Sequence, residues 1–386
     1  MITNALPTTA TPDDVLAVVD ALSPTIAARA DEIEAARRVP GDLLDDLLAA
    51  GVFAMLVPTD LGGLGFDLPD AMRVLDALAT ADASVAWIVL IGGGGWCDVA
   101  TLPRETLDSI FADGDVILAG VFNPSGSITP ESGGYRVRGR WAFASGCEHA
   151  SWLFANAVEG MADGVPMLRG ALFAPSEVEI EDTWHASGLR GTGSQHFHAD
   201  VVVPAERTYR PMVDEPAVDE PILRLPAPAL YSTLVATIAL GIARGALDDI
   251  TALASVKVPL LDHAPLATNP LFQHDLALAD TDLRAARALL RETADRAWAG
   301  ALAQEELTLT QRARIRATAV WVTDRATDVV RTAHRAGGGG AVYRESPLQR
   351  RLRDIQALGQ HFLVKPDTLT TAGALLAGQP LTTPIF

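Results

Sequence analysis

Hydrophobic residues recur at helical spacing in the first third of the chain. The acidic pair Asp13 and Asp14 opens a segment whose apolar residues return every three or four positions. This pattern is typical of an amphipathic helix with a charged first turn. Gly51 is a suitable C-terminal cap for a second helix. The segments expected here are helices over residues 13 onward and 41–50, a glycine-rich loop over 58–65 and a helical stretch over 67–91.

Short β-rich runs replace the helical pattern near residue 115. Residues 135–141 alternate large apolar and charged side chains, as expected of a strand with one buried face. Glycine and proline separate this run from its neighbours, so we predict a small β-barrel or sandwich domain. The predicted strands cover residues 116–121, 135–143, 152–157, 168–173 and 197–203.

The chain returns to a helical pattern after a proline-rich link at residues 221–228. Leu276, Leu283 and Leu290 lie on one apolar stripe of a long helix. Three further helices are expected near residues 308–336, 347–364 and 366–377, which together indicate a four-helix bundle. The sequence thus predicts an α+β fold in three parts. These are an N-terminal helical domain (1–115), a central β domain (116–225) and a C-terminal bundle (226–386).

Composition and charge narrow the classes of function. The chain has 386 residues and a net charge of −18, which disfavours binding to a nucleic-acid backbone. Two cysteines are too few for a disulfide scaffold and fit a reducing cytoplasm. Residues 1–7 show no signal-peptide pattern, and the apolar stretch 83–91 is too short to span a membrane. We expect a cytoplasmic protein that uses neither nucleic acid nor membrane.

Four motifs, in the order of the three regions, carry a family resemblance. They are Gly51 to Pro58 with the glycines of 61–65, Gly139 to Cys147, Trp184 with Gly188 to Ser194, and Gly337 to Gly340 with Pro347 to Asp354. Their order and spacing resemble the acyl-CoA dehydrogenase superfamily over nearly the whole chain. The resemblance implies that superfamily's three-part fold and a bound flavin.

Two positions that hold the catalytic base in acyl-CoA dehydrogenases lack a carboxylate here. One falls at or near Phe362, within residues 355–364, which contain no Asp or Glu. The other falls at Tyr231, and residues 225–244 are also free of acidic side chains. An Arg-x-x-Phe-Gly run that helps to hold FAD is absent from residues 256–263. Because removal of the α-proton of an acyl thioester requires a base, these departures disfavour a dehydrogenase.

The sequence instead resembles the flavin-dependent monooxygenases of the same superfamily. Their pattern Gly-Arg-Trp-x-Phe-x-Ser-Gly-Cys-x-His is present over residues 139–149, and their Arg-Asp pair with a following histidine is present as Arg353, Asp354 and His361. The resemblance implies that a separate NAD(P)H:flavin reductase supplies reduced FMN or FAD. It implies further that the flavin reacts with O2 at C4a and that the resulting hydroperoxide hydroxylates an aromatic or other small organic substrate. It also implies a homotetramer.

Ser145 and His361 are the catalytic residues that the resemblance implies. The Ser145 hydroxyl can donate or accept a hydrogen bond near flavin N5 and so slow the loss of peroxide. His361 titrates in a range that suits stabilising the peroxide or moving a proton. The expected cofactor contacts are Trp141, Phe143, Ser145, Gly146, Arg190, Ser194, Gly338, Gly339 and Arg353. The expected substrate pocket contains Trp96, Phe122 and His149.

Structural roles stay open for several of these residues. Ser145 precedes a glycine and can simply form a turn, and His361 can be an ordinary partly buried helix residue. Residues 337–340 can be an interhelical loop instead of a close approach to flavin phosphate or a neighbouring subunit. Arg190 and Ser194 either contact flavin or order their own loop.

The remaining histidines indicate less. His149 favours a structural hydrogen bond over catalysis. His196 and His198 face the same side of a predicted strand, but no third ligand is suitably spaced, so no metal is expected. Residues 92–97 lack the histidine that aromatic hydroxylases often carry there. A base for a phenolic substrate is therefore missing or comes from elsewhere.

Other functions remain as alternatives to aromatic hydroxylation. An acyl-CoA dehydrogenase with a relocated base is one. Oxidation of a heteroatom on the same fold, such as an amino-sugar nitrogen, is a second. A non-catalytic scaffold that has lost its flavin is the third.

Overall fold

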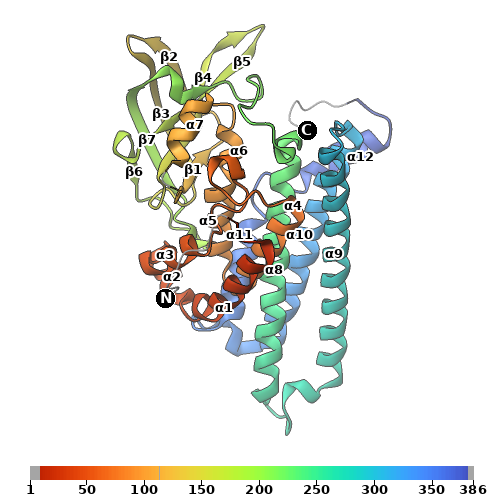
Figure 1. Ribbon diagram of the computed structural model, residues 1–386. Helices are drawn as coiled ribbons and strands as arrows, with labels where there is room; N and C mark the ends of the chain where they lie inside the picture. The colour runs from red at the N-terminus through yellow and green to blue at the C-terminus, as the bar shows by residue number, and fades with distance from the viewer. Residues whose placement is uncertain (1–8, 113, 381–386) are drawn as a thin grey trace.

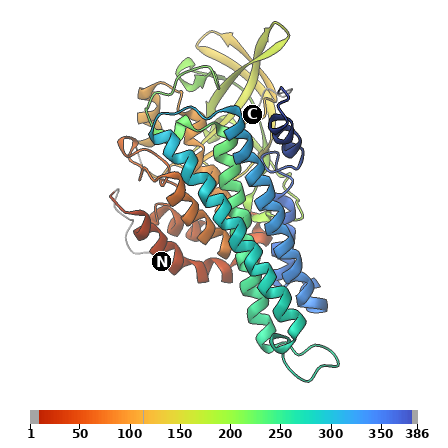
Figure 2. The ribbon, with the colours of Figure 1, turned by 90° about the vertical axis from the view of Figure 1, so that its right-hand side faces the viewer.

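The computed structural model describes residues 9–112 and 114–380 and divides into three regions (Figure 1). The β domain stands at one end of the molecule, the N-terminal helices lie beside the bundle, and the long bundle helices extend past the N-terminal helices at the end away from the β domain (Figures 1 and 2). This arrangement confirms the predicted α+β fold. The segment without a signal-peptide pattern lies outside the described residues.

The N-terminal region consists of short helices, and one break in it fixes the direction of the helix that matters most for the site. The stretch predicted as helical over 67–91 is divided at Asp82, whose backbone is extended (φ −152°, ψ 127°). The Asp82 carboxylate accepts hydrogen bonds from the backbone N–H groups of Ser84 (2.8 Å) and Val85 (3.1 Å), which caps the next helix. The helices are α1 (Pro12–Ala28), α2 (Ala30–Ala36), α3 (Gly41–Ala49), α4 (Leu68–Ala81), α5 (Ala83–Gly94), α6 (Trp96–Val99) and α7 (Arg104–Phe111).

The β domain is one strongly connected sheet with its own core. The sheet order is β6-β7-β3-β2-β4-β5-β8, and β1 pairs in parallel with β4. Trp141, Phe173 and Phe197 fill its interior. The sequence patterns missed β2, β6 and β8. The strands are β1 (Leu118–Val121), β2 (Gly126–Glu131), β3 (Gly134–Ala144), β4 (Trp152–Ala162), β5 (Val165–Phe173), β6 (Glu179–Glu181), β7 (Gln195–Val203) and β8 (Thr208–Tyr209).

The C-terminal bundle has three long helices and two short ones. Its long members are α8 (Ala227–Val256), α9 (Pro270–Leu302) and α10 (Leu309–Gly337), and the short ones are α11 (Pro347–Leu358) and α12 (Asp367–Leu376). Among the described helices, α8 alone is long and apolar enough to cross a membrane, but 89% of its most apolar window is buried inside the protein. It is therefore the central core helix, packed against α4, α9, α10 and α11.

The helix predicted over residues 347–364 is shorter than expected. It ends at Leu358, and the backbone N–H groups of Gln360 and His361 bond three residues back, to the carbonyls of Ala357 and Leu358. Bonds of this kind tighten the chain into turns and end the α-helix. His361 consequently lies in a turn after α11, so its side chain is not confined to a face of that helix.

Candidate active site

Trp87, near the middle of α5, joins the two residues predicted to be catalytic. Its indole N–H donates a hydrogen bond to Ser145 Oγ at 3.0 Å. Its ring meets the His361 ring edge to face, with 5.3 Å between centroids and 73° between planes. The structure thus brings together Ser145 from the end of β3 and His361 from the turn after α11. The sequence patterns did not single out Trp87, because nothing in the periodicity of α5 shows what its side chains contact.

A bulge at the end of β3 gives Ser145 its position. The pairing of β3 with β7 shifts register between Trp141 and Ala144. Phe143 has a positive φ of 67°, which costs free energy in a non-glycine residue and is characteristic of a β-bulge. Gly146 also has a positive φ, 73°, which glycine adopts without steric penalty. These two reversals turn the chain out of the sheet, so that the Ser145 side chain faces α5.

Three hydroxyl groups form a hydrogen-bonded relay that begins at Ser145. Ser145 Oγ lies 2.7 Å from Ser194 Oγ, which lies 2.6 Å from Thr192 Oγ1. Thr192 donates its proton to the carbonyl of Leu189 at 2.8 Å. Since a hydroxyl has one proton, Ser194 must donate to Thr192 and Ser145 must donate to Ser194. The relay therefore leaves one lone pair on Ser145 for an additional donor, because the Trp87 N–H occupies the other.

The turn that carries the relay requires glycine for reasons of space. Leu189 and Gly193 flank it, both in the left-handed region at φ 50° and 51°. A β-carbon at Gly191 would lie 2.2 Å from Ile33, and one at Gly188 would lie 2.1 Å from the carbonyl oxygen of Arg353. The glycine-rich motif thus lets the turn pack directly against α2 and α11.

Asp354 holds the same turn from α11. Its Oδ1 accepts a hydrogen bond of 2.7 Å from the backbone N–H of Leu189. Burial, followed by repulsion from Asp82, raises the pKa of Asp354 to about 7. The Arg-Asp pair of the sequence motif therefore contributes a buried carboxyl that positions the relay.

His361 is a neutral donor at neutral pH. Burial lowers its pKa to about 4. The Leu363 N–H donates a long hydrogen bond of 3.5 Å to His361 Nδ1, which favours the tautomer with the proton on Nε2. The side chain thus offers an N–H group beside Trp87.

Phe143 stands out from the bulge as an exposed aromatic side chain. It is 65% exposed, although it is the second residue before Ser145. Its ring meets Trp184 at 6.2 Å and His196 at 5.8 Å, both edge to face. An apolar platform held by a strained backbone fits a flat ligand next to Ser145.

Comparisons with known proteins identify the family. The pattern for "Acyl-CoA dehydrogenase, N-terminal domain" matches residues 16–101, and that for "Acyl-CoA dehydrogenase, C-terminal domain" matches residues 233–366. An indole-3-acetate monooxygenase from Pseudomonas putida is 32% identical over 92% of this chain and 91% of its own length. The chain belongs to the flavin-dependent monooxygenases of the acyl-CoA dehydrogenase family.

Two more relatives agree with this membership. The oxygenase component of an FADH2-dependent resorcinol hydroxylase from Rhizobium sp. is 29% identical over 89% of this chain and 88% of its own. The crystal structure of 3-HSA hydroxylase from Rhodococcus sp. RHA1 has a TM-score of 0.88 at 28% identity and covers 97% of this chain and 99% of that chain. The prediction of a flavin-dependent monooxygenase is thereby confirmed.

Two tryptophans of the monooxygenase do not fit their predicted roles. Trp141 is fully buried in the β-domain core, where its N–H donates to the Asn156 carbonyl (2.9 Å) and its ring stacks on Phe197. Its side chain is therefore enclosed by protein instead of facing a cofactor. Trp96 is also fully buried. It follows Trp87 by nine residues, two and a half helical turns, so it points to the opposite side of the helix.

Two arginines predicted to bind flavin are occupied by one glutamate. Arg353 donates to Glu34 Oε2 (2.9 Å) and to the carbonyl of Ser187 (2.6 Å), and Arg190 Nε lies 3.8 Å from Glu34 Oε1. Arg353 thus ties α11 to α2 and to the loop before the relay. Arg190 Nε is buried without a hydrogen bond among the described residues, so this side chain keeps a donor for a ligand.

The other predicted contacts are Gly338, Gly339, Phe122 and His149, and their surroundings assign none of them a clear role in the site. Gly338 and Gly339 follow α10 and are exposed, and the Lys257 ammonium donates to the carbonyl of Gly337 beside them. Phe122 follows β1 and is half-buried, and its carbonyl accepts a hydrogen bond from Asn156. His149 lies in the turn after Ser145, and burial lowers its pKa to about 4.

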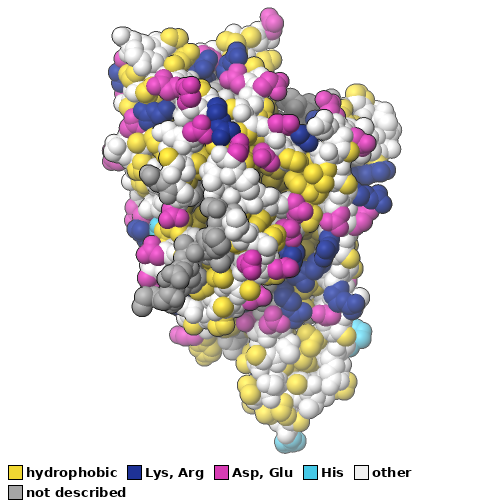
Figure 3. Space-filling model, viewed as in Figure 1, with side chains coloured by type: hydrophobic (Ala, Val, Ile, Leu, Met, Phe, Trp, Pro, Cys, Tyr) yellow, Lys and Arg dark blue, Asp and Glu magenta, His cyan; other side chains and the backbone are white. Residues whose placement is uncertain are grey.

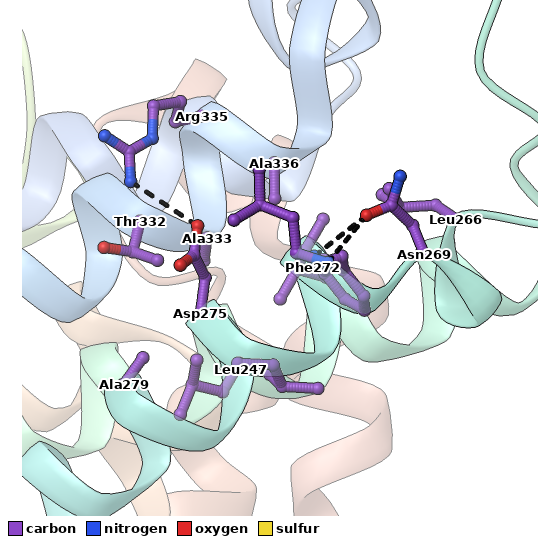
Figure 4. Close-up of a pocket in the computed structure, with 13 residues that line it drawn as sticks. Leu247, Leu266, Asn269, Phe272, Asp275, Ala279, Thr332, Ala333, Arg335 and Ala336 are labelled. Carbon is purple, nitrogen blue, oxygen red and sulfur yellow. Dashed lines mark hydrogen bonds and ion pairs between the residues drawn. The ribbon is translucent and has the colours of Figure 1, made fainter.

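A recess in the bundle is separate from this site. Leu247 of α8, Phe272 of α9 and Ala333 of α10 are among its apolar walls (Figure 4). At its edge Arg335 reaches Asp275 at 3.9 Å, so its charged side chains are paired. None of the predicted site residues lines it. Within the described part of the chain, no group of three metal-ligating side chains is found either.

Proposed function

We propose that this monooxygenase is the oxygenase component of a two-component system and hydroxylates a small aromatic substrate. A separate NAD(P)H:flavin reductase supplies the reduced FMN or FAD. The observation that carries this proposal is the arrangement around Trp87. Trp87 contacts both Ser145, whose single proton is already donated to Ser194, and the neutral side chain of His361.

The relay fits reduced flavin better than oxidised flavin. Ser145 donates its only proton to Ser194 and keeps one lone pair free. Flavin N5 carries a hydrogen in the reduced form and is an acceptor in the oxidised form, so only the reduced form offers the donor that Ser145 lacks. When bound, reduced flavin supplies the two electrons with which O2 is activated. The chain's own contribution is to hold N5–H and to surround it with protein.

His361 supports the same reaction from the other side of Trp87. Its neutral Nε2–H can donate to negative charge that develops on oxygen, and a donor held in place by packing needs little reorganisation. Because the pKa of His361 is lowered to about 4, this role persists over the neutral range. Trp87 positions both residues, and its own side chain is only 6% exposed.

The remaining predicted contacts either bind the flavin of the same subunit or approach the flavin of a neighbouring subunit. Phe143 forms an aromatic platform for the flat flavin ring beside Ser145 and Gly146, and Arg190 offers its free donor to a polar part of the ligand. Gly338 and Gly339 form an exposed backbone that suits close approach by a flavin held in a neighbouring copy. Nothing within 4 Å would meet a side chain at Gly339, so the surface there is open.

A homotetramer in the cytoplasm completes the proposal. Apolar side chains remain exposed along α9, among them Leu271 (69%), Leu278 (53%) and Leu302 (57%). The end of the bundle distant from the β domain shows few charged side chains (Figure 3), and Leu260 and Leu261 there are 92% and 89% exposed. Such faces favour contacts between subunits. Two free cysteines suit a reducing compartment.

Isotope labelling tests the activity directly. The protein is incubated with FMN or FAD, NADH, a flavin reductase and 18O2, together with resorcinol and indole-3-acetate as trial substrates. We expect a hydroxylated product containing one 18O atom, formed only when the reductase is present. Product without label, or label without the reductase, would contradict the proposal.

A second measurement addresses the dehydrogenase alternative. Oxidised, flavin-loaded protein is mixed anaerobically with a panel of acyl-CoA thioesters. We expect the visible flavin absorbance to persist. Bleaching by any acyl-CoA would favour dehydrogenation with a relocated base over monooxygenation.

A further inference from the structure

One carboxylate and two tyrosine hydroxyls lie where the three regions of the chain meet. The Tyr231 hydroxyl, on α8, donates to Asp98 Oδ2 on α6 at 2.7 Å and lies 2.9 Å from the carbonyl of Gly94. Tyr209 of β8 is close enough for the Asp98 charge to raise the pKa of its hydroxyl further above the usual range. The site described above uses none of these groups.

The cluster shares one helix face with Trp87. Gly95 continues α5 into α6 with helical backbone angles (φ −58°, ψ −16°). Counting from Trp87, Ile91, Gly94 and Asp98 follow at steps of four, seven and eleven residues, which return to the same side of a helix. Asp98 therefore lies about 16 Å along the axis from Trp87, with apolar surface between them.

The residues around Asp98 lie deep in the protein but keep some accessible surface. Ile91, Cys97 and Tyr231 are each partly accessible, as is Asp98 itself, although protein surrounds Asp98 on all sides. A space therefore adjoins them. Tyr209, which is only 2% exposed, borders the same region, since the Asp98 charge acts on its hydroxyl.

Among residues 9–112 and 114–380, Asp98 has no cation to balance its charge. Burial raises its pKa to about 6, and its Tyr231 hydrogen bond is the only effect that lowers it. No arginine, lysine or histidine of the described residues pairs with it, and Oδ1 has no partner. The titratable groups that face it are Cys97, Tyr209 and Tyr231, which are neutral at pH 7, and burial raises the pKa of each further. Retaining an unpaired carboxylate at such a depth costs free energy, which points to function.

We propose that Asp98 and Tyr231 bind the substrate of this monooxygenase, and that they select an aromatic molecule with an O–H or N–H donor, such as a phenol or an indole. The proposal rests on the proposed aromatic hydroxylation and adds the group that the substrate must carry. Asp98 Oδ1 accepts the donor, and Tyr231 is a positioning residue that holds the other oxygen. The apolar face at Ile91 contacts the ring.

This contact also activates the ring. A hydrogen bond from a phenol or indole to a carboxylate increases the electron density of the ring, which favours attack by an electrophilic oxygen atom. Asp98 thus occupies the functional place of the histidine that is absent from residues 92–97. No complete proton transfer is required for this effect.

Binding of matched probe pairs tests the proposal without turnover. Dissociation constants for phenol and anisole, and for indole and 1-methylindole, are measured anaerobically on protein loaded with reduced FMN. At pH 8 we expect each donor-bearing probe to bind at least about tenfold more tightly than its methylated partner, a difference of about 1.4 kcal/mol. Asp98→Asn and Asp98→Ala should reduce this ratio to about threefold or less. The Asp324→Asn variant on α10, another carboxyl whose pKa is raised by burial, should keep it.

The pH dependence separates charge from shape. The wild-type ratio should decline as the pH falls below about 6, where Asp98 takes up a proton. In Tyr231→Phe the pKa of Asp98 rises, since its lowering hydrogen bond is lost, so the decline should begin at a higher pH. Equal binding of both members of each pair, an unchanged ratio in both Asp98 variants, or no binding of any probe would overturn the proposal. If labelled product forms but the donor-bearing and methylated probes bind equally well, the monooxygenase function stands and only the role of Asp98 is removed.

Discussion

The two ends of the α5–α6 helix face differ in how far their polar groups are satisfied by hydrogen bonds. At the Trp87 end, every hydroxyl proton of the relay has an acceptor, and His361 is neutral. At the Asp98 end, a carboxylate has one oxygen without a partner and no paired cation among the residues that the structure describes. A flavin that must bind in its reduced form is suited to a site of fixed hydrogen-bond polarity. A substrate that must be recognised and activated is suited to a site with an unsatisfied group, so the difference indicates which end binds which ligand.

The largest expected effect comes from removing the neutral donor. His361→Ala should slow the reaction of enzyme-bound reduced flavin with O2 by about 100-fold, the low end of what a positioned donor or acid contributes. Stopped-flow absorbance under varied O2 measures this rate. His274→Ala is the matched control, because His274 is an exposed histidine on α9 that contacts none of the site residues. An unchanged rate in His361→Ala would mean that the reactive edge of the flavin lies elsewhere.

Ser145→Ala should fail at a later step than His361→Ala. Reduced flavin should still bind and still consume O2, but hydrogen peroxide should replace hydroxylated product. Loss of one hydrogen bond costs roughly 1–3 kcal/mol, or about 5- to 150-fold in coupling. Peroxide and product are quantified together for each mole of O2. Ser127→Ala, an exposed serine on β2 of the same sheet, should remain coupled, and coupling in Ser145→Ala like that of wild type would contradict the role of the relay.

A smaller effect tests the direction of the relay. In Ser194→Ala the Ser145 proton loses its acceptor and can turn toward flavin N5, which favours the oxidised form. We expect the preference for reduced over oxidised FMN to fall by about 2- to 10-fold, the worth of one neutral hydrogen bond. The two dissociation constants, or the midpoint potential of bound FMN, provide the measurement. A preference equal to that of wild type would show that Ser145 does not depend on Ser194 for its orientation.

The smallest effect concerns the contribution of Asp98, at the other end of the α5–α6 helix face, to the stability of the protein. Asp98 has a folded-state pKa of about 6, above its usual value of 3.8. The folded protein therefore binds the proton more tightly than the unfolded chain, and Asp98 lowers stability as the pH rises from about 4 to 6. Asp98→Asn should be more stable than wild type by about 1–2 kcal/mol at pH 8, allowing for its partial exposure, and equal to it near pH 4. Thermal unfolding at both pH values measures this. A loss of stability at pH 8 would mean that Asp98 is structurally satisfied.

The sequence by itself determined the class of fold, the order of the three regions and the family. Hydrophobic periodicity depends on local geometry, so the long helices and the longer strands were predictable. Strands β6 and β8 were missed because they have only three and two residues, and β2 was missed because most of its six side chains are exposed, which leaves little periodic signal. Motif spacing identified Ser145 and His361, and the structure brings these two residues together at Trp87.

Only the tertiary structure decided what the neighbouring residues do. Trp141 and Ser145 belong to one motif, but the bulge in β3 leaves the first in the sheet core and turns the second toward α5. Trp96 was predicted to line the substrate pocket, and the helix instead presents Asp98 on the face of Trp87. The relay joins Ser145 to Ser194 through a turn held by Asp354, and Tyr231 meets Asp98 from another region of the chain. Contacts between segments far apart in sequence depend on how helices and strands pack, and local patterns contain no record of that packing.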